Sequence, residues 1–241
     1  MGNENGEWIM RGLEPDDPLC IKSPEELTEL IIKVGFLPLF RNSIPGFSVE
    51  EHTVAANWWS DNEAADPWEW RKVLARSEKV AYGKFFEGKA GYVSPEWLPR
   101  FINYRRDGYD FDARWDDEKA KYRSKCVMDL FEDREELSSN IMKELAGFGK
   151  DGMKNFEGTI NELQMQTYLT VRDFRRRLNK RGEPYGWGIA VYSTPEKLWG
   201  SEYVSSMYGE DPKASFEAMV EKVRENFPAE EKVIRKILSI K

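Results

Sequence analysis

The spacing of apolar residues changes between Ser138 and Thr194 in a way that predicts two helices followed by a β-hairpin. In both helices the apolar residues recur at helical spacing: Ile141, Met142 and Leu145 in the first, Phe156, Ile160, Leu163 and Thr167 in the second. The next apolar residues alternate, as in a half-buried strand: Trp187, Ile189 and Val191. Residues 179–186 supply Asn, Gly and Pro for the turn. Two helices with a two-stranded hairpin predict a winged helix.

The N-terminal half contains helix starts in which a capping residue is followed by proline. They lie at Ser23-Pro24, Asp66-Pro67 and Ser94-Pro95. Residues 80–86 and 90–94 are rich in apolar and aromatic residues and flank Glu87-Gly88-Lys89, which predicts a second hairpin. The order helix, helix, hairpin, helix also fits a second winged-helix-like unit.

We therefore expect an α+β protein in four parts. Residues 1–18 are predicted to be a flexible N-terminal arm, and residues 19–116 a helix-and-hairpin unit. Residues 117–200 are the predicted winged-helix unit, and residues 201–241 the C-terminal helices. The polar stretch 105–117 is expected to connect the two halves, and a helix is expected from about Asp117 to Phe131.

The composition argues against several classes of protein. Hydrophobic residues make up 40% of the chain, but no apolar run approaches the length of about 18 residues that a membrane-spanning helix needs. Cys20 and Cys126 are isolated and lack the spacing of a metal motif, which is typical of a reducing cytoplasm. There is no glycine-rich phosphate loop and no dinucleotide-binding fingerprint. We expect a cytoplasmic protein without a membrane partner, a metal or a cofactor, and the sequence does not predict its oligomeric state.

The charge is distributed unevenly along the chain. The net charge is −7, yet acidic side chains outnumber basic ones by ten in residues 1–70, so the remainder is slightly basic. Such an asymmetry permits a local basic patch for nucleic acid on an acidic protein. The predicted nucleic-acid contacts are one amide on the second helix, the basic residues of the hairpin and two arginines in the connecting stretch: Asn161, Arg175, Arg176, Arg177, Lys180, Arg181, Arg105 and Arg106.

Tryptophan is frequent, and four of the nine tryptophans lie within a short span: Trp58, Trp59, Trp68 and Trp70. We interpret this cluster as part of the N-terminal core. A platform on which bases stack is the alternative interpretation.

Several segments resemble the AlkZ-related proteins, a bacterial family grouped with the AlkZ-type winged-helix DNA glycosylases. The segments are LQMQTYL at 163–169, DFRRRLNKRGEPYGW at 173–187, YSTPEKLWG at 192–200, YGKFF at 82–86 and NYRRDGYDFDA at 103–113. The resemblance extends from about Glu25 to Gly200. It implies DNA as the partner and hydrolysis of the N-glycosidic bond of alkylated or crosslinked bases, without a metal.

In the glycosylases that the chain resembles, a Gln-x-Gln pair positions the attacking water, which implies catalytic roles for Gln164 and Gln166. A neutral amide oxygen can orient a water molecule and favour positive charge that develops on the sugar. Residues two apart on a helix point about 200° away from each other, so both amides can reach one sugar only if the chain leaves the helix there.

The sequence leaves alternatives open for the roles of these residues and for the function of the protein. Gln164 and Gln166 could be ordinary helix glutamines, and the hairpin arginines could simply be solvated. Winged helices also bind proteins, so a non-enzymatic module for protein interaction or transcriptional regulation is the rival to a DNA glycosylase-like enzyme.

Overall fold

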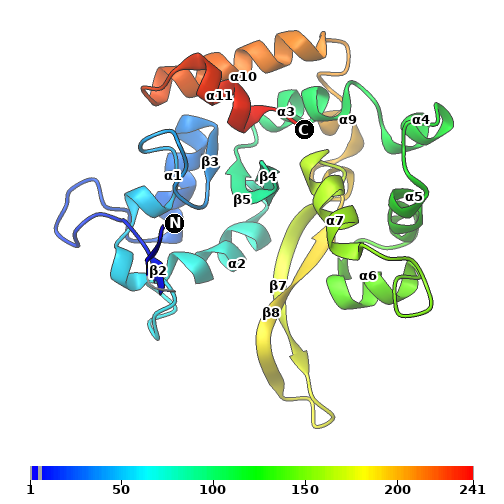
Figure 1. Ribbon diagram of the computed structural model, residues 1–241, viewed down its shortest axis with the longest axis horizontal. Helices are drawn as coiled ribbons and strands as arrows, with labels where there is room; N and C mark the ends of the chain where they lie inside the picture. The colour runs from blue at the N-terminus through cyan, green and yellow to red at the C-terminus, as the bar shows by residue number, and fades with distance from the viewer. Residues whose placement is uncertain (1, 5–6, 241) are drawn as a thin grey trace.

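Two small three-stranded antiparallel sheets, each with its own helices, organise the protein (Figure 1). The computed structural model describes residues 2–4 and 7–240. The mixed α+β class predicted from the sequence is confirmed. Within the described residues, no helix is long and apolar enough to cross a membrane.

The N-terminal sheet has the strand order β3-β5-β4. The elements of this unit are α1 (Pro24–Val34), β3 (Phe36–Pro38), the short 3₁₀ helices η1 (Glu50–His52) and η2 (Ala55–Asn57), α2 (Pro67–Ser77), β4 (Ala81–Phe86) and β5 (Lys89–Val93). The predicted helix starts at Ser23 and Asp66 are confirmed, since the side chain of each accepts a hydrogen bond from a backbone N–H of the first turn.

The C-terminal sheet has the matching strand order β6-β8-β7. Its unit comprises α5 (Tyr122–Met128), η3 (Asp129–Phe131), β6 (Leu137–Ser138), α6 (Ser139–Leu145), α7 (Phe156–Met165), β7 (Thr170–Leu178) and β8 (Pro184–Ser193). In both units the third strand along the chain lies in the middle of the sheet, and the first and second strands form its two edges.

Helices α2 and α7 repeat one pattern of burial although their sequences differ. When Pro67 is aligned with Phe156, the buried residues of the two helices coincide: Pro67, Trp70, Arg71, Leu74 and Ala75 in α2, and Phe156, Thr159, Ile160, Leu163 and Gln164 in α7. The same alignment matches Glu78 with Thr167, which both take the left-handed backbone conformation after the helix, with φ of 56° and 62°. The repeat is therefore one of geometry, and it escapes a search for repeated residues.

The two units pack against each other reciprocally. Helix α2 of the first unit contacts β7 of the second, α7 contacts β4, and β4 contacts β7. The Thr170 hydroxyl donates to the carbonyl of Tyr82 at 2.9 Å, and Arg76 pairs with Asp173. One continuous set of buried apolar residues, from Leu27 to Leu238, therefore crosses the boundaries expected between the parts.

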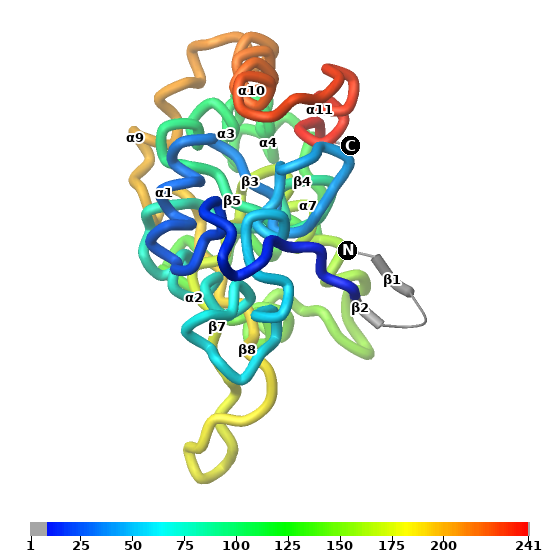
Figure 2. Tube along the Cα trace, turned by 90° about the vertical axis from the view of Figure 1, so that its left-hand side faces the viewer, coloured from blue at the N-terminus to red at the C-terminus, as the bar shows by residue number. Residues whose placement is uncertain are grey.

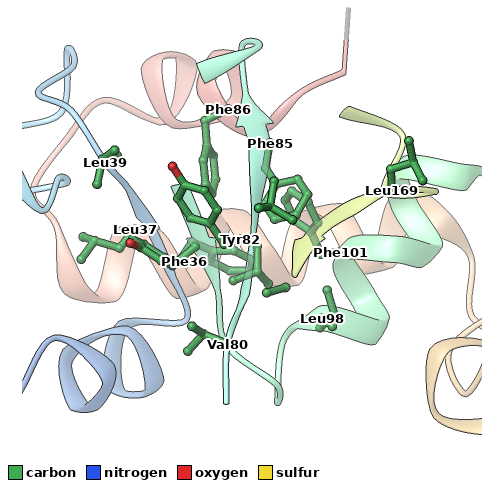
Figure 3. Close-up of a cluster of buried hydrophobic side chains, with 14 of the residues drawn as sticks. Phe36, Leu37, Leu39, Val80, Tyr82, Phe85, Phe86, Leu98, Phe101 and Leu169 are labelled. Atoms are coloured by element: carbon green, nitrogen blue, oxygen red, sulfur yellow. The ribbon is translucent and has the colours of Figure 1, made fainter. Parts of the chain in front are cut away.

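The remaining helices pack mainly against one another. They are α3 (Leu98–Arg106), α4 (Phe111–Asp116), α8 (Pro195–Trp199), α9 (Ser201–Val204), α10 (Pro212–Asn226) and α11 (Glu231–Leu238). Helix α3 is in contact with α9 and α10. Figure 3 shows Phe85 of β4 beside Phe101 of α3, with Tyr82 on the other side of the strand. The ring centroids of Phe85 and Phe101 are 5.6 Å apart. Helix α10 packs on α3 and α11 on α10 at the opposite end of the molecule from the β7–β8 hairpin (Figure 1).

Two local predictions need correction. The helix start expected at Ser94-Pro95 is displaced, because α3 begins only at Leu98 and its N-cap residue is Trp97. The helix expected from about Asp117 is also shorter, since it begins at Tyr122 and changes to a 3₁₀ turn at Asp129.

The predicted arm, residues 1–18, includes residues 1, 5 and 6, which lie outside the described part. Strands β1 (Gly2–Glu4) and β2 (Glu7–Ile9) pair with each other. Further along, the backbone N–H of Leu13 donates to the carbonyl of Thr53 at 2.9 Å, so this part of the chain lies along the N-terminal unit. The division into four parts stays a prediction.

Leu74 and Leu163 occupy matching buried positions, so Leu74→Ala and Leu163→Ala should cost similar amounts of stability. We expect each to lower the free energy of unfolding by about 2–5 kcal/mol, measured by urea denaturation. The exposed control Leu178→Ala should change it by less than about 0.5 kcal/mol. A small effect at either buried leucine would contradict the shared core.

Candidate functional site

The β7–β8 hairpin projects from the body of the protein in two perpendicular views (Figures 1 and 2). Asn179 shapes its tip: its backbone N–H donates to the carbonyl of Glu183 at 2.9 Å, and its side-chain oxygen accepts from the N–H of Arg181 at 2.8 Å. Gly182 takes the left-handed conformation, with φ of 78°. The turn residues predicted for this hairpin thus have defined hydrogen-bonding roles.

Basic residues near the base of the hairpin are held by acidic partners. Arg172 pairs with Glu78 and Glu136, and Arg175 pairs with Glu136 at 2.5 Å and Asp173 at 2.6 Å. Hydrogen bonding to Arg175 is the largest influence that lowers the pKa of Glu136. Arg175, a predicted nucleic-acid contact, is therefore engaged within the protein.

The outer basic residues of the hairpin are exposed. Arg176 lies 3.8 Å from Glu63, a distance at which an exposed pair contributes little. Arg177, Lys180 and Arg181 have no ion-pair partner among residues 2–4 and 7–240. We name Arg176, Arg177, Lys180 and Arg181 the outer hairpin cations. They are the predicted contacts best placed to meet phosphate.

Gln164 is buried and faces the N-terminal unit. Its side-chain oxygen accepts a hydrogen bond from the backbone N–H of Lys84 at 3.1 Å, and its amide nitrogen donates to the carbonyl of Ile160 at 3.3 Å. The amide also meets the hydroxyl of Tyr192, whose pKa is raised mainly by burial. Gln164 thus connects α7 to β4 and to β8.

Gln166 is half-buried at the C-terminus of α7, and it does not line the cavity that Gln164 lines. Its backbone N–H still donates to the carbonyl of Glu162 at 2.9 Å, so the chain leaves the helix only at Thr167. The departure from the helix that would turn both amides toward one site does not occur between the two glutamines.

Three other predicted contacts face the interior of the protein. The Asn161 amide lies beside Gly88 in the β4–β5 turn. Arg105 is buried and donates to the carbonyls of Phe85 at 2.7 Å and Met165 at 3.1 Å, and burial lowers its pKa to about 10. Arg106 is completely buried.

The Arg106 guanidinium donates to the carbonyl of Thr167 at 2.8 Å and to the hydroxyl of Tyr208 at 3.0 Å, and it pairs with Glu196. Arg105 and Arg106 together fix the turn that follows α7. Neither guanidinium can reach a phosphate on the surface.

A cavity of about 460 Å³ lies where the two units meet. This volume is within the range of small-molecule sites. Its walls contain Gln164 and five aromatic residues: Phe40, Trp68, Tyr82, Phe174 and Tyr192. Four basic residues also line it: Arg41, Arg71, Lys84 and Lys89. The other lining residues are small or aliphatic: Gly83, Gly88, Ala90, Val171 and Ala190. We name it the junction cavity.

Arg71 is the most deeply placed cation of the junction cavity. Its guanidinium carbon lies 3.2 Å from the ring centroid of Trp68 and 4.6 Å from that of Phe174, and its Nε donates to the carbonyl of Trp68 at 2.6 Å. Burial raises the pKa of Tyr82, and the positive charge of Arg71, together with a hydrogen bond to it, partly offsets that rise. The aromatic rings thus stabilise a cation that is only 8% exposed.

The tryptophan cluster divides between the core, the cavity and the surface, where Trp59 is 40% exposed. Trp58 and Trp70 are buried in the core, as the sequence predicts, whereas Trp68 is half-buried at the cavity. The sequence contained one usable signal for Arg71, because Trp68 and Arg71 are three residues apart on a helix and therefore neighbours.

Among the described residues no three His, Cys, Asp or Glu side chains come close enough to hold a metal ion. Asp110 caps α4 by accepting from the backbone N–H of Ala113 at 2.7 Å.

Comparison with protein families gives a match that includes the hairpin and the junction cavity. The model of the family described as "AlkZ related" matches residues 21–239, nearly the entire chain. The chain belongs to the AlkZ-related family. Comparison with curated proteins and with solved structures gives no match. The outer hairpin cations, Gln164 and the junction cavity all lie within the matched residues of this AlkZ-related protein.

Arg106→Met should destabilise the protein because it leaves Glu196 and the Thr167 carbonyl without their partner. We expect a loss of about 3–5 kcal/mol in the free energy of unfolding. Arg177→Met, at an exposed position, should change it by less than about 0.5 kcal/mol. Equal stability of the two variants in urea would show that Arg106 does not hold the turn after α7.

The lowered pKa of Asp173 predicts that the protein loses a specific part of its stability in acid. Burial raises its pKa, but hydrogen bonds from Arg76 and Arg175 outweigh burial, and the net pKa is lowered. The stabilisation is complete above the unfolded pKa of about 4 and disappears as the pH falls through the lower folded value. Between about pH 5 and pH 2, Asp173→Asn should therefore lose less stability than the wild type. The exposed control Asp133→Asn should follow the wild-type curve in urea titrations at each pH.

Proposed function

We propose that this AlkZ-related protein binds DNA through a winged helix and acts as a DNA glycosylase-like enzyme on a base held in the junction cavity. Residues 122–193 support the winged-helix assignment by their order: helix α5, strand β6, helices α6 and α7, then the β7–β8 hairpin. The second strand of this hairpin, β8, also pairs with β6. Residues 24–93 have the same strand order with α2 in the place of α7, so we propose a second winged-helix-like unit there.

The outer hairpin cations are the proposed phosphate contacts. They are exposed on a projecting hairpin, and three of the four have no acidic partner in the described part of the chain. Lys and Arg that approach phosphates release counterions, so such contacts give an affinity that falls steeply with salt. Arg105 and Arg106 have no place in this interface because their guanidinium groups are buried.

A single observation carries the enzymatic part of the proposal. Trp68, Arg71 and Phe174 line both the junction cavity and a smaller pocket, and Arg176 and Trp187 of the hairpin also line that smaller pocket. The hairpin and the cavity are thus adjacent, and a nucleotide extruded from a duplex held at the hairpin would meet an aromatic cavity with Gln164 in its wall. Enzymes that act on bases commonly extrude them into such pockets.

Gln164 is the proposed contact to the bound nucleotide. Its carbonyl oxygen already accepts one hydrogen bond from Lys84 and retains a second lone pair for a water or a base. The resemblance implied a pair of glutamines, but Gln166 could join Gln164 only if the turn around Thr167 rearranged when DNA binds.

The alternative is a module that binds a protein partner. The observation in its favour is the apolar surface of the hairpin, where Leu178, Tyr185 and Trp187 are all at least half exposed. Exposed apolar side chains on a monomer can mark an interaction surface.

Reversing charge on the hairpin tests the DNA interface. The combined variant Arg177→Glu, Lys180→Glu and Arg181→Glu should lower affinity for duplex DNA at least about tenfold and reduce the slope of log affinity against log salt. The matched control Lys33→Glu, Lys213→Glu and Lys232→Glu has the same change in net charge at exposed positions outside the hairpin. Equal losses in both variants, or no binding by the wild type, would reject the proposal and favour the protein-binding module.

Base release tests the role of Gln164. On a duplex that contains alkylated bases, Gln164→Met should lower the rate of base release about 100-fold or more if its amide orients water, while the melting temperature monitors folding. Gln166→Ala should have a much smaller effect in the arrangement described. Unchanged release in both variants would exclude both glutamines from the chemistry.

A further inference from the structure

The junction cavity has an unbalanced charge. Four of its lining residues are basic, and none is Asp or Glu. Lys84 and Lys89 are exposed at its edge and have no ion-pair partner within the described ranges 2–4 and 7–240. Arg41 pairs with Glu51 at 3.6 Å, outside the cavity lining. The potential inside is therefore set by cations.

Aromatic walls alone would attract a cation, so the two effects compete. In this cavity the competition is decided by Arg71, whose guanidinium already lies over the rings of Trp68 and Phe174. A second cation would lose those two ring faces and would lie close to Arg71, with no carboxylate in the lining to compensate. A planar group without positive charge meets no such penalty.

We propose that the junction cavity binds an uncharged or anionic planar heterocycle, of the class of neutral purine and pyrimidine bases and their nucleotides, and excludes positively charged bases. As a substrate preference this rests on the proposed glycosylase-like function. As a property of the cavity it stands independently, because it depends only on the lining residues.

The chemistry of base release gives the cations a use. When water attacks C1′ of a nucleotide with a neutral base, a C–O bond forms and the C1′–N bond breaks. The electron pair of the broken bond goes to the base, which leaves as an anion and afterwards takes up a proton, and the proton of the attacking water goes to solvent. Arg71, Lys84 and Lys89 would stabilise that anion. A cationic alkylated base leaves as a neutral molecule and needs no such help, so this cavity suits neutral lesions.

Free nucleosides test the proposal without DNA. At pH 6, calorimetry should show binding of guanosine and tighter binding of guanosine 5′-monophosphate, whose phosphate can reach Lys84 or Lys89. The 7-methylguanosine cation, which has nearly the same shape as guanosine, should bind at least about tenfold more weakly. Binding of the cation as tightly as guanosine, or no binding of any of the three at millimolar concentration, would overturn the proposal.

Matched variants locate the effect. Lys84→Gln combined with Lys89→Gln should remove most of the advantage of the monophosphate, whereas Lys213→Gln, at an exposed position in α10, should leave it unchanged. Ala190→Phe should fill the cavity and abolish guanosine binding while duplex DNA binding persists. Retained guanosine binding in Ala190→Phe, with an unchanged melting temperature, would place the ligand elsewhere and overturn the proposal.

The two proposals can fail separately. If the wild type binds guanosine selectively but does not bind duplex DNA, the function proposed above fails and the cavity specificity remains. If duplex binding depends on the hairpin cations but the acceleration of base release over the spontaneous rate is greater for 7-methylguanine than for the neutral lesion 1,N⁶-ethenoadenine, the DNA interface remains and the charge selectivity fails.

Discussion

The contact of strand β4 with β7 and α7 is the constraint on which the remaining structure depends. It joins the two sheets through the Thr170–Tyr82 hydrogen bond and places the backbone of Lys84 against the Gln164 amide. Arg105 reinforces the contact from α3, because its guanidinium joins the carbonyl of Phe85 in β4 to that of Met165 in α7. The junction cavity exists because these two units are held at one fixed separation.

The polar groups of the protein divide into two populations with different roles. Buried arginines with carbonyl or aromatic partners, such as Arg71, Arg105 and Arg106, stabilise the fold and tune the cavity. Exposed cations on the outer hairpin have few acidic partners and are available to a polyanion. Arginine thus has two roles in this protein: buried arginines hold the fold together, and exposed arginines on the hairpin are available to a ligand.

Local sequence rules predicted the elements better than the site. Capping at Ser23 and Asp66 and the turn residues around Asn179 act over a few positions, so both helix starts and the projecting hairpin could be predicted. Arg105 and Arg106 lie in a polar stretch that looked like a solvated connection, because their partners are tens of residues away in the sequence. The junction cavity was beyond prediction for the same reason, since it is assembled from both units.

The reciprocal packing of the units also explains why their two hairpins differ in length. Strands β4 and β5 are joined by Glu87 and Gly88, both left-handed with φ of 50° and 74°, which is the tightest connection that a hairpin allows. Its turn rests beside Asn161 of α7, where a longer hairpin would collide with the second unit. At the tip of the β7–β8 hairpin, no described residue lies against Gly182 in this way. The same strand order thus occurs twice with different results: the β4–β5 hairpin is packed inside the protein, and the β7–β8 hairpin projects from it.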